Sequence, residues 1–244
     1  MRDADMRAVP SLRSVSTIRP DPSLREQVAS WLRSALFIGD LVPGATFSVP
    51  ALAEKFGVSP TPVREAVLDL VQQGLVVAVP SKGFLVVDPS PETIAQTVAI
   101  RRLIEVPTTC SIAETITAQQ IAPLRRKARA ILRHARHNDL RGFVEVDYLF
   151  HGELTRLCGN PMLTELVEDL RSRARVHTVP YLASRDLLVE TAQQHLQLLD
   201  AMAVHDVTEV ARISELHMGY ALAARERELA AGASGPDQPS EPRP

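Results

Sequence analysis

The sequence is poor in the features that mark several classes of protein. Its 244 residues include two cysteines, too few for a disulfide framework, so we expect a reducing compartment and place the protein in the cytoplasm. No apolar run reaches the roughly 18 residues of a membrane span, and the first residues lack the apolar stretch of a secretory signal. Basic and acidic residues number 27 and 29, which excludes nucleic-acid binding by bulk charge but allows a local basic surface.

Aromatic residues make up 4% of the chain and glycines number 11, which disfavours a β-rich fold with many turns. Abundant Ala, Leu, Val, Arg and Glu favour helices. We predict a mainly α protein with a winged helix-turn-helix over 21–88 and an antiparallel bundle of six or seven helices over 91–230. The polar segment 1–20 is predicted to be a flexible arm, and the Gly/Pro/Ser-rich segment 231–244 a disordered tail.

The predicted N-terminal unit mixes helical and strand-like segments. A short helix around 50–56 is followed by a glycine-containing turn and a second helix over 60–73. Two β-rich runs follow at 75–79 and 84–87, joined as a hairpin. A short helix, a tight turn and a second helix form a helix-turn-helix, and the small β-hairpin wing makes the arrangement the winged variant.

The start of the second helix is the predicted DNA-reading element. Ser59 is a good N-cap, and the prolines of the first turn lose no hydrogen bond there. Arg64 can make a bidentate contact to guanine O6 and N7. We therefore predict DNA contacts from the helix start and the wing tip, namely from Ser59, Pro60, Thr61, Arg64, Lys82 and Gly83. The alternative from pattern alone is a plain helical hairpin with a capped helix.

Three histidines of the predicted bundle lie on apolar helix faces. Asp147 and His151 are spaced i, i+4 and so project from one side of a helix. His195 and His217 lie on the apolar stripes of two later, consecutive helices. One carboxylate and three imidazoles can converge on Zn²⁺, Ni²⁺, Co²⁺ or Mn²⁺ and leave a coordination position open. The alternative is that the histidines are packed core residues.

Motifs in the first unit resemble the GntR family of bacterial regulators. The resemblance rests above all on Gly-Val-Ser-Pro-Thr-Pro-Val-Arg-Glu-Ala over 57–66, with Leu-Arg-Glu-Gln-Val at 24–28 and Lys-Gly-Phe at 82–84. It implies a winged helix-turn-helix that binds a palindromic operator as a homodimer, with Arg64 contacting a base. Pro60 stands where the family usually has arginine, and this departure bears on the operator sequence.

The second unit resembles the FCD ligand-binding domain of the FadR-like branch. The matching motifs are Arg101-x-x-x-Glu105, Asp147-x-x-x-His151, Gly159-Asn160-Pro161-x-Leu163, and His195 with His217. The resemblance implies a helical bundle in which Asp147 and the three histidines hold a divalent metal, zinc first, and the metal binds a small carboxylate effector. Arg101 would pair with that carboxylate or, alternatively, with Glu105. We also predict effector contacts from Arg175 and Tyr220.

The predicted function is a DNA-binding transcriptional regulator whose operator affinity is controlled by a small carboxylate at or near the metal. We expect no enzymatic activity and no membrane partner. The alternative is a helical-bundle metalloenzyme acting on a small organic acid, but Glu145 and Glu153 point away from the predicted ligand face and supply no general base. A third possibility is an interaction module in which the histidines only pack.

Overall fold

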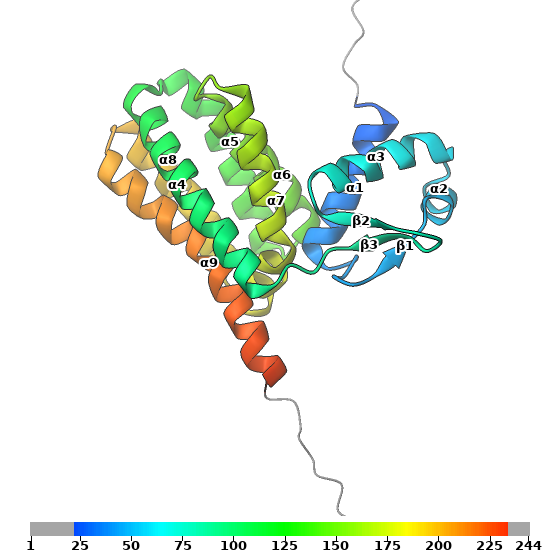
Figure 1. Ribbon diagram of the computed structural model, residues 1–244. Helices are drawn as coiled ribbons and strands as arrows, with labels where there is room; N and C mark the ends of the chain where they lie inside the picture. Colours follow the sequence, from blue (N-terminus) through cyan, green and yellow to red (C-terminus); the bar gives the residue numbers. More distant parts are fainter. Residues whose placement is uncertain (1–21, 234–244) are drawn as a thin grey trace, which may run out of the picture.

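The computed structural model describes residues 22–233, and Figure 1 shows two units in the order predicted. The predicted arm at 1–20 and residues 234–244 of the predicted tail lie outside the described residues. The last helix runs to Ala233 and so includes the first three residues of that predicted tail. The mainly α fold, with its small sheet beside a helix-turn-helix, is confirmed.

The N-terminal unit contains three helices and a small sheet. Its elements are α1 (Leu24–Ile38), β1 (Thr46–Phe47), α2 (Val49–Phe56), α3 (Pro60–Gln72), β2 (Val76–Val79) and β3 (Gly83–Val86). The strands are antiparallel in the order β1-β3-β2. The sequence does not predict β1, because two residues carry no alternating pattern. At the wing, Gly83 has φ +94°, and a Cβ there would lie 2.4 Å from the Phe47 carbonyl oxygen, so the sheet itself requires glycine.

The start of α3 departs from the predicted cap in one respect. Ser59 occupies the N-cap position with extended backbone, but its side chain makes no capping hydrogen bond. An N-cap side chain usually accepts from the N–H two or three residues later. The third position here is Pro62, which has no N–H. The exposed Ser59 hydroxyl is therefore not held by the cap that serine usually forms.

Six helices of the described chain form the second unit. They are α4 (Pro91–Thr115), α5 (Ala118–Arg136), α6 (Leu140–Arg156), α7 (Pro161–Ser184), α8 (Leu188–Ala203) and α9 (Val207–Ala233). Proline usually ends or kinks a helix, and a break near Pro107 would be expected from the sequence, but α4 continues through this residue. Proline frees the carbonyl four residues earlier, and Leu103 is 78% exposed, so water can satisfy that carbonyl. No helix of the described residues is long and apolar enough to cross a membrane.

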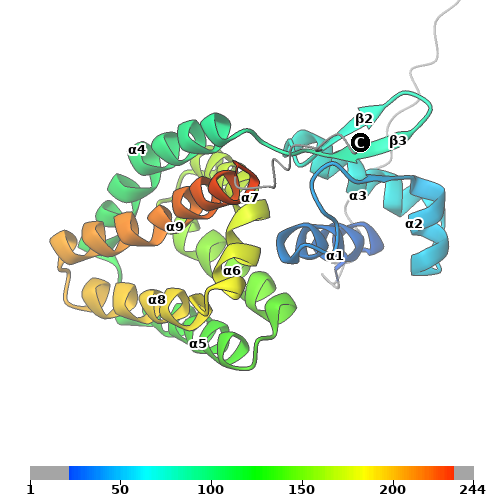
Figure 2. The same ribbon diagram turned by 90° about the horizontal axis from the view of Figure 1, so that it is seen from below.

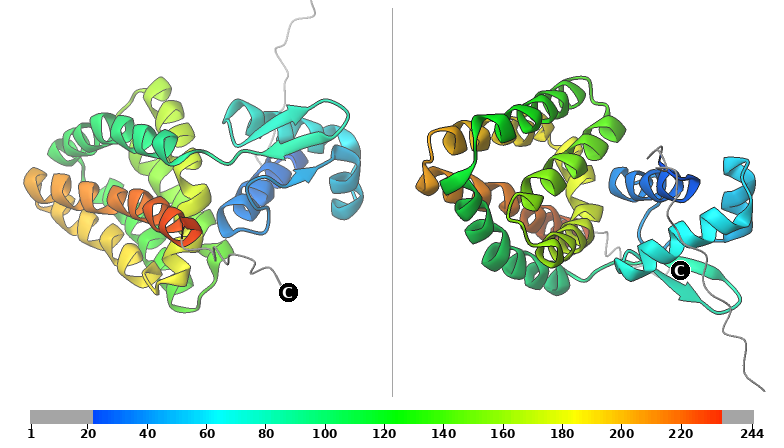
Figure 3. Two further views of the ribbon diagram at one scale, coloured as in Figure 1. Left: turned by 60° about the horizontal axis from the view of Figure 1, so that its bottom comes forward. Right: turned by 90° about the horizontal axis from the view of Figure 1, so that it is seen from above.

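The two units share a continuous apolar core. Buried residues of α1, including Leu32 and Phe37, belong to the same cluster as Phe150 and Leu199 of the bundle. Helix α1 packs against α6 and α7, as Figures 2 and 3 show from different sides. The connection between the units is therefore a packed interface as well as a linker, and α6 and α7 lie between α1 and the rest of the bundle.

Candidate functional site

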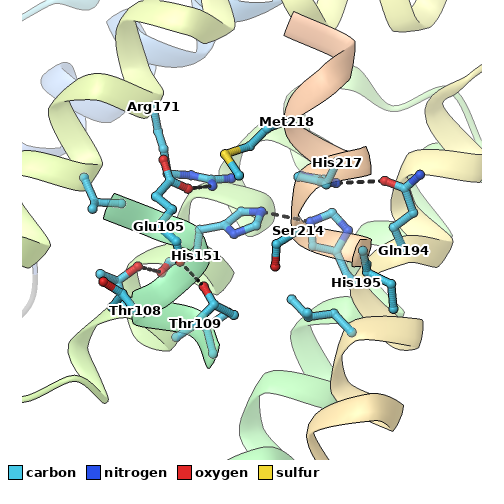
Figure 4. Close-up of a pocket in the computed structure, with 15 residues that line it drawn as sticks. Glu105, Thr108, Thr109, His151, Arg171, Gln194, His195, Ser214, His217 and Met218 are labelled. Atoms are coloured by element: carbon cyan, nitrogen blue, oxygen red, sulfur yellow. Dashed lines mark hydrogen bonds and ion pairs between the residues drawn. The ribbon is translucent and has the colours of Figure 1, made fainter. Parts of the chain in front are cut away.

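Four potential metal ligands from three helices meet inside the bundle. Asp147 and His151 come from α6, His195 from α8 and His217 from α9. The first three side chains are buried and the fourth is half-buried. Figure 4 shows the three imidazoles turned toward one another. The structure thus brings together every residue of the predicted metal set.

The separations between these donor atoms fit a shared metal ion. Nε2 of His195 lies 2.8 Å from Oδ1 of Asp147 and 3.0 Å from Nε2 of His151. Nε2 of His151 lies 3.5 Å from the same carboxylate oxygen, and all four donors lie within 4.8 Å of one another. Ligands about 2.1 Å from one ion stand about 3.0 Å apart at right angles and about 3.4 Å apart at the tetrahedral angle.

Two of the imidazoles, those of His195 and His217, are hydrogen-bonded through Nδ1, which leaves the Nε2 lone pair of each ring free. Nδ1 of His195 donates to the Ala192 carbonyl oxygen, 3.3 Å away. Nδ1 of His217 donates to Oε1 of Gln194 at 3.0 Å. A carbonyl oxygen can only accept, so each Nδ1 carries the proton. Each Nε2 is then unprotonated, as a metal ligand must be.

The Gln194 contact continues into a chain of hydrogen bonds with one direction. Nε2 of Gln194 donates to the Tyr220 hydroxyl at 3.2 Å. That hydroxyl donates to a carboxylate oxygen of Glu190 at 2.8 Å. Burial, followed by the Glu190 charge, raises the pKa of Tyr220, so its hydroxyl keeps its proton. Since Glu190 can only accept, the chain fixes the Gln194 amide and, through it, the tautomer of His217.

The surroundings keep the three imidazoles neutral. Burial, followed by the positive charge of Arg171, lowers the pKa of His151 well below its usual range and that of His195 to about 3. Burial, followed by the charges of the other two histidines, lowers the pKa of His217 as well. At neutral pH the rings therefore present lone pairs, and protons compete weakly for them.

Two chambers flank the donor group. One, of about 40 Å³, has Thr108, Thr109, Thr155 and Ser214 among its lining residues; we call it the threonine chamber (Figure 4). The other, of about 50 Å³, is lined by Arg101, Arg171, Arg175 and Tyr220; we call it the arginine chamber. A water needs about 10–15 Å³ of such space, so each chamber is comparable in size with a carboxylate group. All three predicted effector residues line the arginine chamber.

Buried ion pairs hold the arginines in place. Arg101 makes the predicted alternative contact, a 2.5 Å bond to Glu105, and Arg171 contacts the other oxygen of Glu105 at 2.7 Å. Arg175 pairs with Oδ2 of Asp147, whereas the contacts of His151 and His195 are to Oδ1. Burial alone would raise the pKa of Glu105, but Arg101 and Arg171 lower it to about 2. Burial lowers the pKa of Arg171 to about 10 and that of Arg175 to about 9.

The predicted DNA-contacting residues lie on a separate surface of the N-terminal unit. Ser59, Pro60, Thr61 and Arg64 are exposed at the N-terminal end of α3. Lys82 is exposed beside Gly83 at the tip of the β2–β3 hairpin. An ion pair between Arg25 and Asp69, at 2.5 Å, joins α1 to the outer side of α3.

Sequence reasoning missed Glu105, Arg171 and Gln194 as residues of the site. The sequence indicated Glu105 only as an alternative partner for Arg101. Arg171 belongs to an arginine-rich run, and the sequence does not show which of these arginines point into the bundle. Gln194 directly precedes His195 and is 3% exposed in the structure, but the sequence carries no signal of that burial. A glutamine on a buried helix face needs a polar partner.

Replacing Gln194 should weaken metal binding without changing any ligand. In Gln194→Ala, Nδ1 of His217 loses its acceptor, and we expect Zn²⁺ affinity to fall about 10–100-fold. Titration calorimetry of the metal-free protein measures this affinity. The neighbouring exposed Gln193 provides the matched control, Gln193→Ala, which should bind Zn²⁺ as the unaltered chain does. Equal affinities for the two variants would show that Gln194 does not position His217.

Comparisons with known proteins agree with both units. The family model for bacterial regulatory proteins of the gntR family matches residues 24–86. The model for the FCD domain matches residues 96–220, which covers the donor group and both chambers. The two matches correspond to the winged helix-turn-helix and to the helical bundle.

Similar proteins are regulators too. HTH-type transcriptional regulator McbR of Escherichia coli K12 is 31% identical over 148 residues, 61% of this chain and 67% of McbR. HTH-type transcriptional repressor RspR of the same strain is 26% identical over 204 residues, 82% of this chain and 88% of RspR. The structure of E. coli McbR/YncC matches with a TM-score of 0.73 and 27% identity, over 85% of this chain and 99% of that one. This chain therefore belongs to the gntR family of bacterial regulatory proteins, in the branch with an FCD domain, and is a DNA-binding transcriptional regulator.

Proposed function

We propose that the protein binds a palindromic operator as a homodimer and that a small carboxylate, held at or near a divalent metal in the bundle, controls its operator affinity. Residues 21–88 carry DNA binding and 91–230 carry metal and effector binding. The observation that carries the proposal is the convergence of Asp147 and three neutral histidines beside a chamber lined by arginines. As a regulator bound to bacterial DNA, the protein would work in the cytoplasm.

The donor set supports a first-row divalent metal. Imidazole nitrogens and a carboxylate oxygen suit Zn²⁺, and they also suit Ni²⁺, Co²⁺ or Mn²⁺. Asp147, His151, His195 and His217 would hold the ion, and an ion with an open position polarises a ligand oxygen. The role of the protein is to keep the imidazoles deprotonated and oriented, which the Gln194 contact and the buried surroundings do.

The charge balance around the site supports an anionic effector. The buried arginines are Arg101, Arg171 and Arg175, and the carboxylates paired with them are Glu105 and Asp147. With neutral histidines the site has an excess of positive charge, and a divalent cation would increase it. Buried charge is costly unless it is paired, so an anion in the arginine chamber would be bound strongly. A carboxylate matches the planar guanidinium fork as well as the metal.

The geometry of α3 and the wing supports operator binding through the predicted residues. The N-terminal end of a groove-reading helix presents its first-turn residues to base edges, and Arg64 is exposed there. Backbone N–H groups at the same end favour a phosphate, and Lys82 can reach the backbone from the wing. The near balance of acidic and basic residues limits non-specific attraction, so a dimer that binds two half-sites would supply the affinity.

The metalloenzyme alternative lacks a base in the chambers. Of the described residues that line them, two are carboxylates, Glu105 and Asp147. Asp147 belongs to the donor group, and Glu105 is bonded to two arginines with a pKa of about 2, which makes it a weak base. General base catalysis needs a pKa nearer the working pH. The site is better suited to binding an anion than to turning it over.

Operator binding should depend on Arg64. Selection from random duplex DNA at about 100 mM salt should enrich one short palindrome. On that sequence, Arg64→Ala should weaken binding about 10–100-fold, the cost of a lost bidentate base contact. Arg129→Ala, which removes an exposed arginine of the bundle, is the matched control and should bind as before. An Arg64→Ala variant with full affinity would contradict the assigned reading residue.

Metal loading should stabilise the protein through Asp147. Zn²⁺ at about 100 times its dissociation constant adds about 2.7 kcal/mol to the free energy of unfolding, seen as a rise in Tm over the chelator-treated protein. Asp147→Asn should lose most of this rise. Asp200→Asn, at an exposed position of α8, should retain it. An unchanged Tm for the unaltered chain would favour histidines that only pack.

A carboxylate should change operator affinity only when the metal is present. We expect that small mono- and dicarboxylates, tested one by one by fluorescence anisotropy on the selected operator, include one that shifts the dissociation constant about 5–150-fold. Chelation should abolish this shift, since the metal supplies part of the binding. A shift that persists without metal would separate effector binding from the donor group, and turnover of the acid would establish the enzyme instead.

A further inference from the structure

Three arginines of α7 contact three different parts of the molecule. They are Arg171, Arg173 and Arg175, at alternate positions of one helix. Residues four apart share a helix face, whereas the residue midway between them lies on the other side. Arg171 and Arg175 accordingly face the arginine chamber. Arg173 instead donates to the backbone oxygen of Gln73, the C-cap of the reading helix α3, at 2.9 Å.

Arg175 has a second contact on the side of the DNA-binding unit. Its guanidinium carbon lies 5.9 Å from the ring centre of Phe37, within the distance of about 6 Å at which a cation is attracted to a ring face. Phe37 belongs to α1 and is 2% exposed. Helix α1 packs in turn against α3. A single guanidinium therefore contacts a predicted metal ligand, Asp147, and the first helix of the DNA-binding unit.

Occupancy of the site would act directly on this guanidinium. A divalent cation held by Oδ1 of Asp147 would repel the nearby positive charge of Arg175, which is bonded to Oδ2 of the same carboxylate. The repulsion of like charges a few ångströms apart is strong in a buried place. A carboxylate in the arginine chamber would attract the guanidinium away from Asp147. Both changes weaken the pair that keeps Arg175 against Phe37.

We propose that Arg175 and Phe37 form the contact through which occupancy of the donor group alters the packing of α1 against α6 and α7. With the site empty, Arg175 binds Asp147 and lies over the Phe37 ring. With the site occupied, Arg175 leaves the ring, and α1 shifts against the bundle, carrying α3 with it. The proposal rests on the proposed function, because it assumes that the donor group binds a metal. A ligand can shift such an equilibrium only by binding the two arrangements differently, and the charge on Arg175 provides that difference.

A natural fluorescent side chain lies at the interface between α1 and α6. Trp31 is the single tryptophan of the sequence and lies on α1, two turns before the end of the helix. The guanidinium of Arg141 from α6 lies 5.2 Å from its ring centre, and Arg141 also contacts Asp40 at 3.1 Å. A shift of α1 against α6 changes the distance between this cation and the indole. Lys55 and Phe56 of α2 contact the same indole, so Trp31 emission responds to the packing of α1 against both α6 and α2 without any DNA.

The experiment follows Trp31 emission while Zn²⁺ alone is added to the metal-free full-length protein. Calorimetry on the same samples measures Zn²⁺ affinity. In Phe37→Leu the ring is lost, and we expect the emission change to fall about fivefold. Zn²⁺ should still bind, with an affinity raised by up to about tenfold, because the ion no longer has to break the cation–ring contact. Phe37→Met replaces the ring with an unbranched side chain that can adapt to the vacated space, and it should behave in the same way if the leucine variant folds poorly. Phe47→Leu makes the same substitution in the small sheet and should keep the full response.

The outcomes separate the inference from the proposed function. Loss of the emission change in both Phe37 variants, with Zn²⁺ still bound, supports the contact as the connection between the site and α1. A full response in a folded Phe37 variant overturns it, and so does Zn²⁺ binding to the unaltered chain with no emission change. In those two cases the metal site itself stands. No Zn²⁺ binding to the unaltered chain overturns the proposed function, and the inference with it.

Discussion

The helical unit is organised around electron pairs that face one another in a buried interior. Oδ1 of Asp147 and Nε2 of His195 lie 2.8 Å apart, and the protonated Nδ1 of that ring leaves its Nε2 without a proton. Two acceptors this close repel each other unless a cation lies between them. A proton is a poor candidate, since burial and Arg171 hold the pKa of His195 at about 3. A divalent metal would satisfy the same electron pairs without protonating a ring, which is why the arrangement supports the proposed metal site.

The need to hold these electron pairs close together explains the contacts of the surrounding residues. The donors come from α6, α8 and α9, so their convergence depends on how these helices pack and not on one local motif. Glu190 and Gln194 are spaced i, i+4 on α8, so they lie on one face of that helix. His217 and Tyr220 are spaced i, i+3 on α9 and likewise share a face. The two faces are joined by a continuous chain of hydrogen bonds. The arginines compensate the carboxylates and leave positive charge that an anionic ligand can neutralise.

The sequence indicates the residues of the proposed metal site better than the residues that support them. Asp147 and His151 can be recognised from their i, i+4 spacing. His195 can be recognised because it is a polar residue in an apolar stripe. Gln194 and Arg171 have no such signal, because their partners lie on other helices and become neighbours only through packing. Helix continuity at Pro107 depends on an exposed carbonyl, which a residue pattern does not record. Strand β1 exists only through its pairing with β3, so two residues alone could not predict it.

The position of α7 decides how the DNA-binding unit can sense the site. If a flexible linker were the sole connection between the units, changes in the bundle would not affect the reading helix. Helix α1, however, is buried in the same core as α6 and α8, so the two units are packed together. On α7, one face carries the arginines of the chamber and the other carries Arg173, bonded to the end of α3. Allosteric coupling typically amounts to about 1–3 kcal/mol, and one buried cation–ring contact supplies about 1–2 kcal/mol. The few polar contacts that cross this interface are therefore of the size that the proposed control of operator affinity would require.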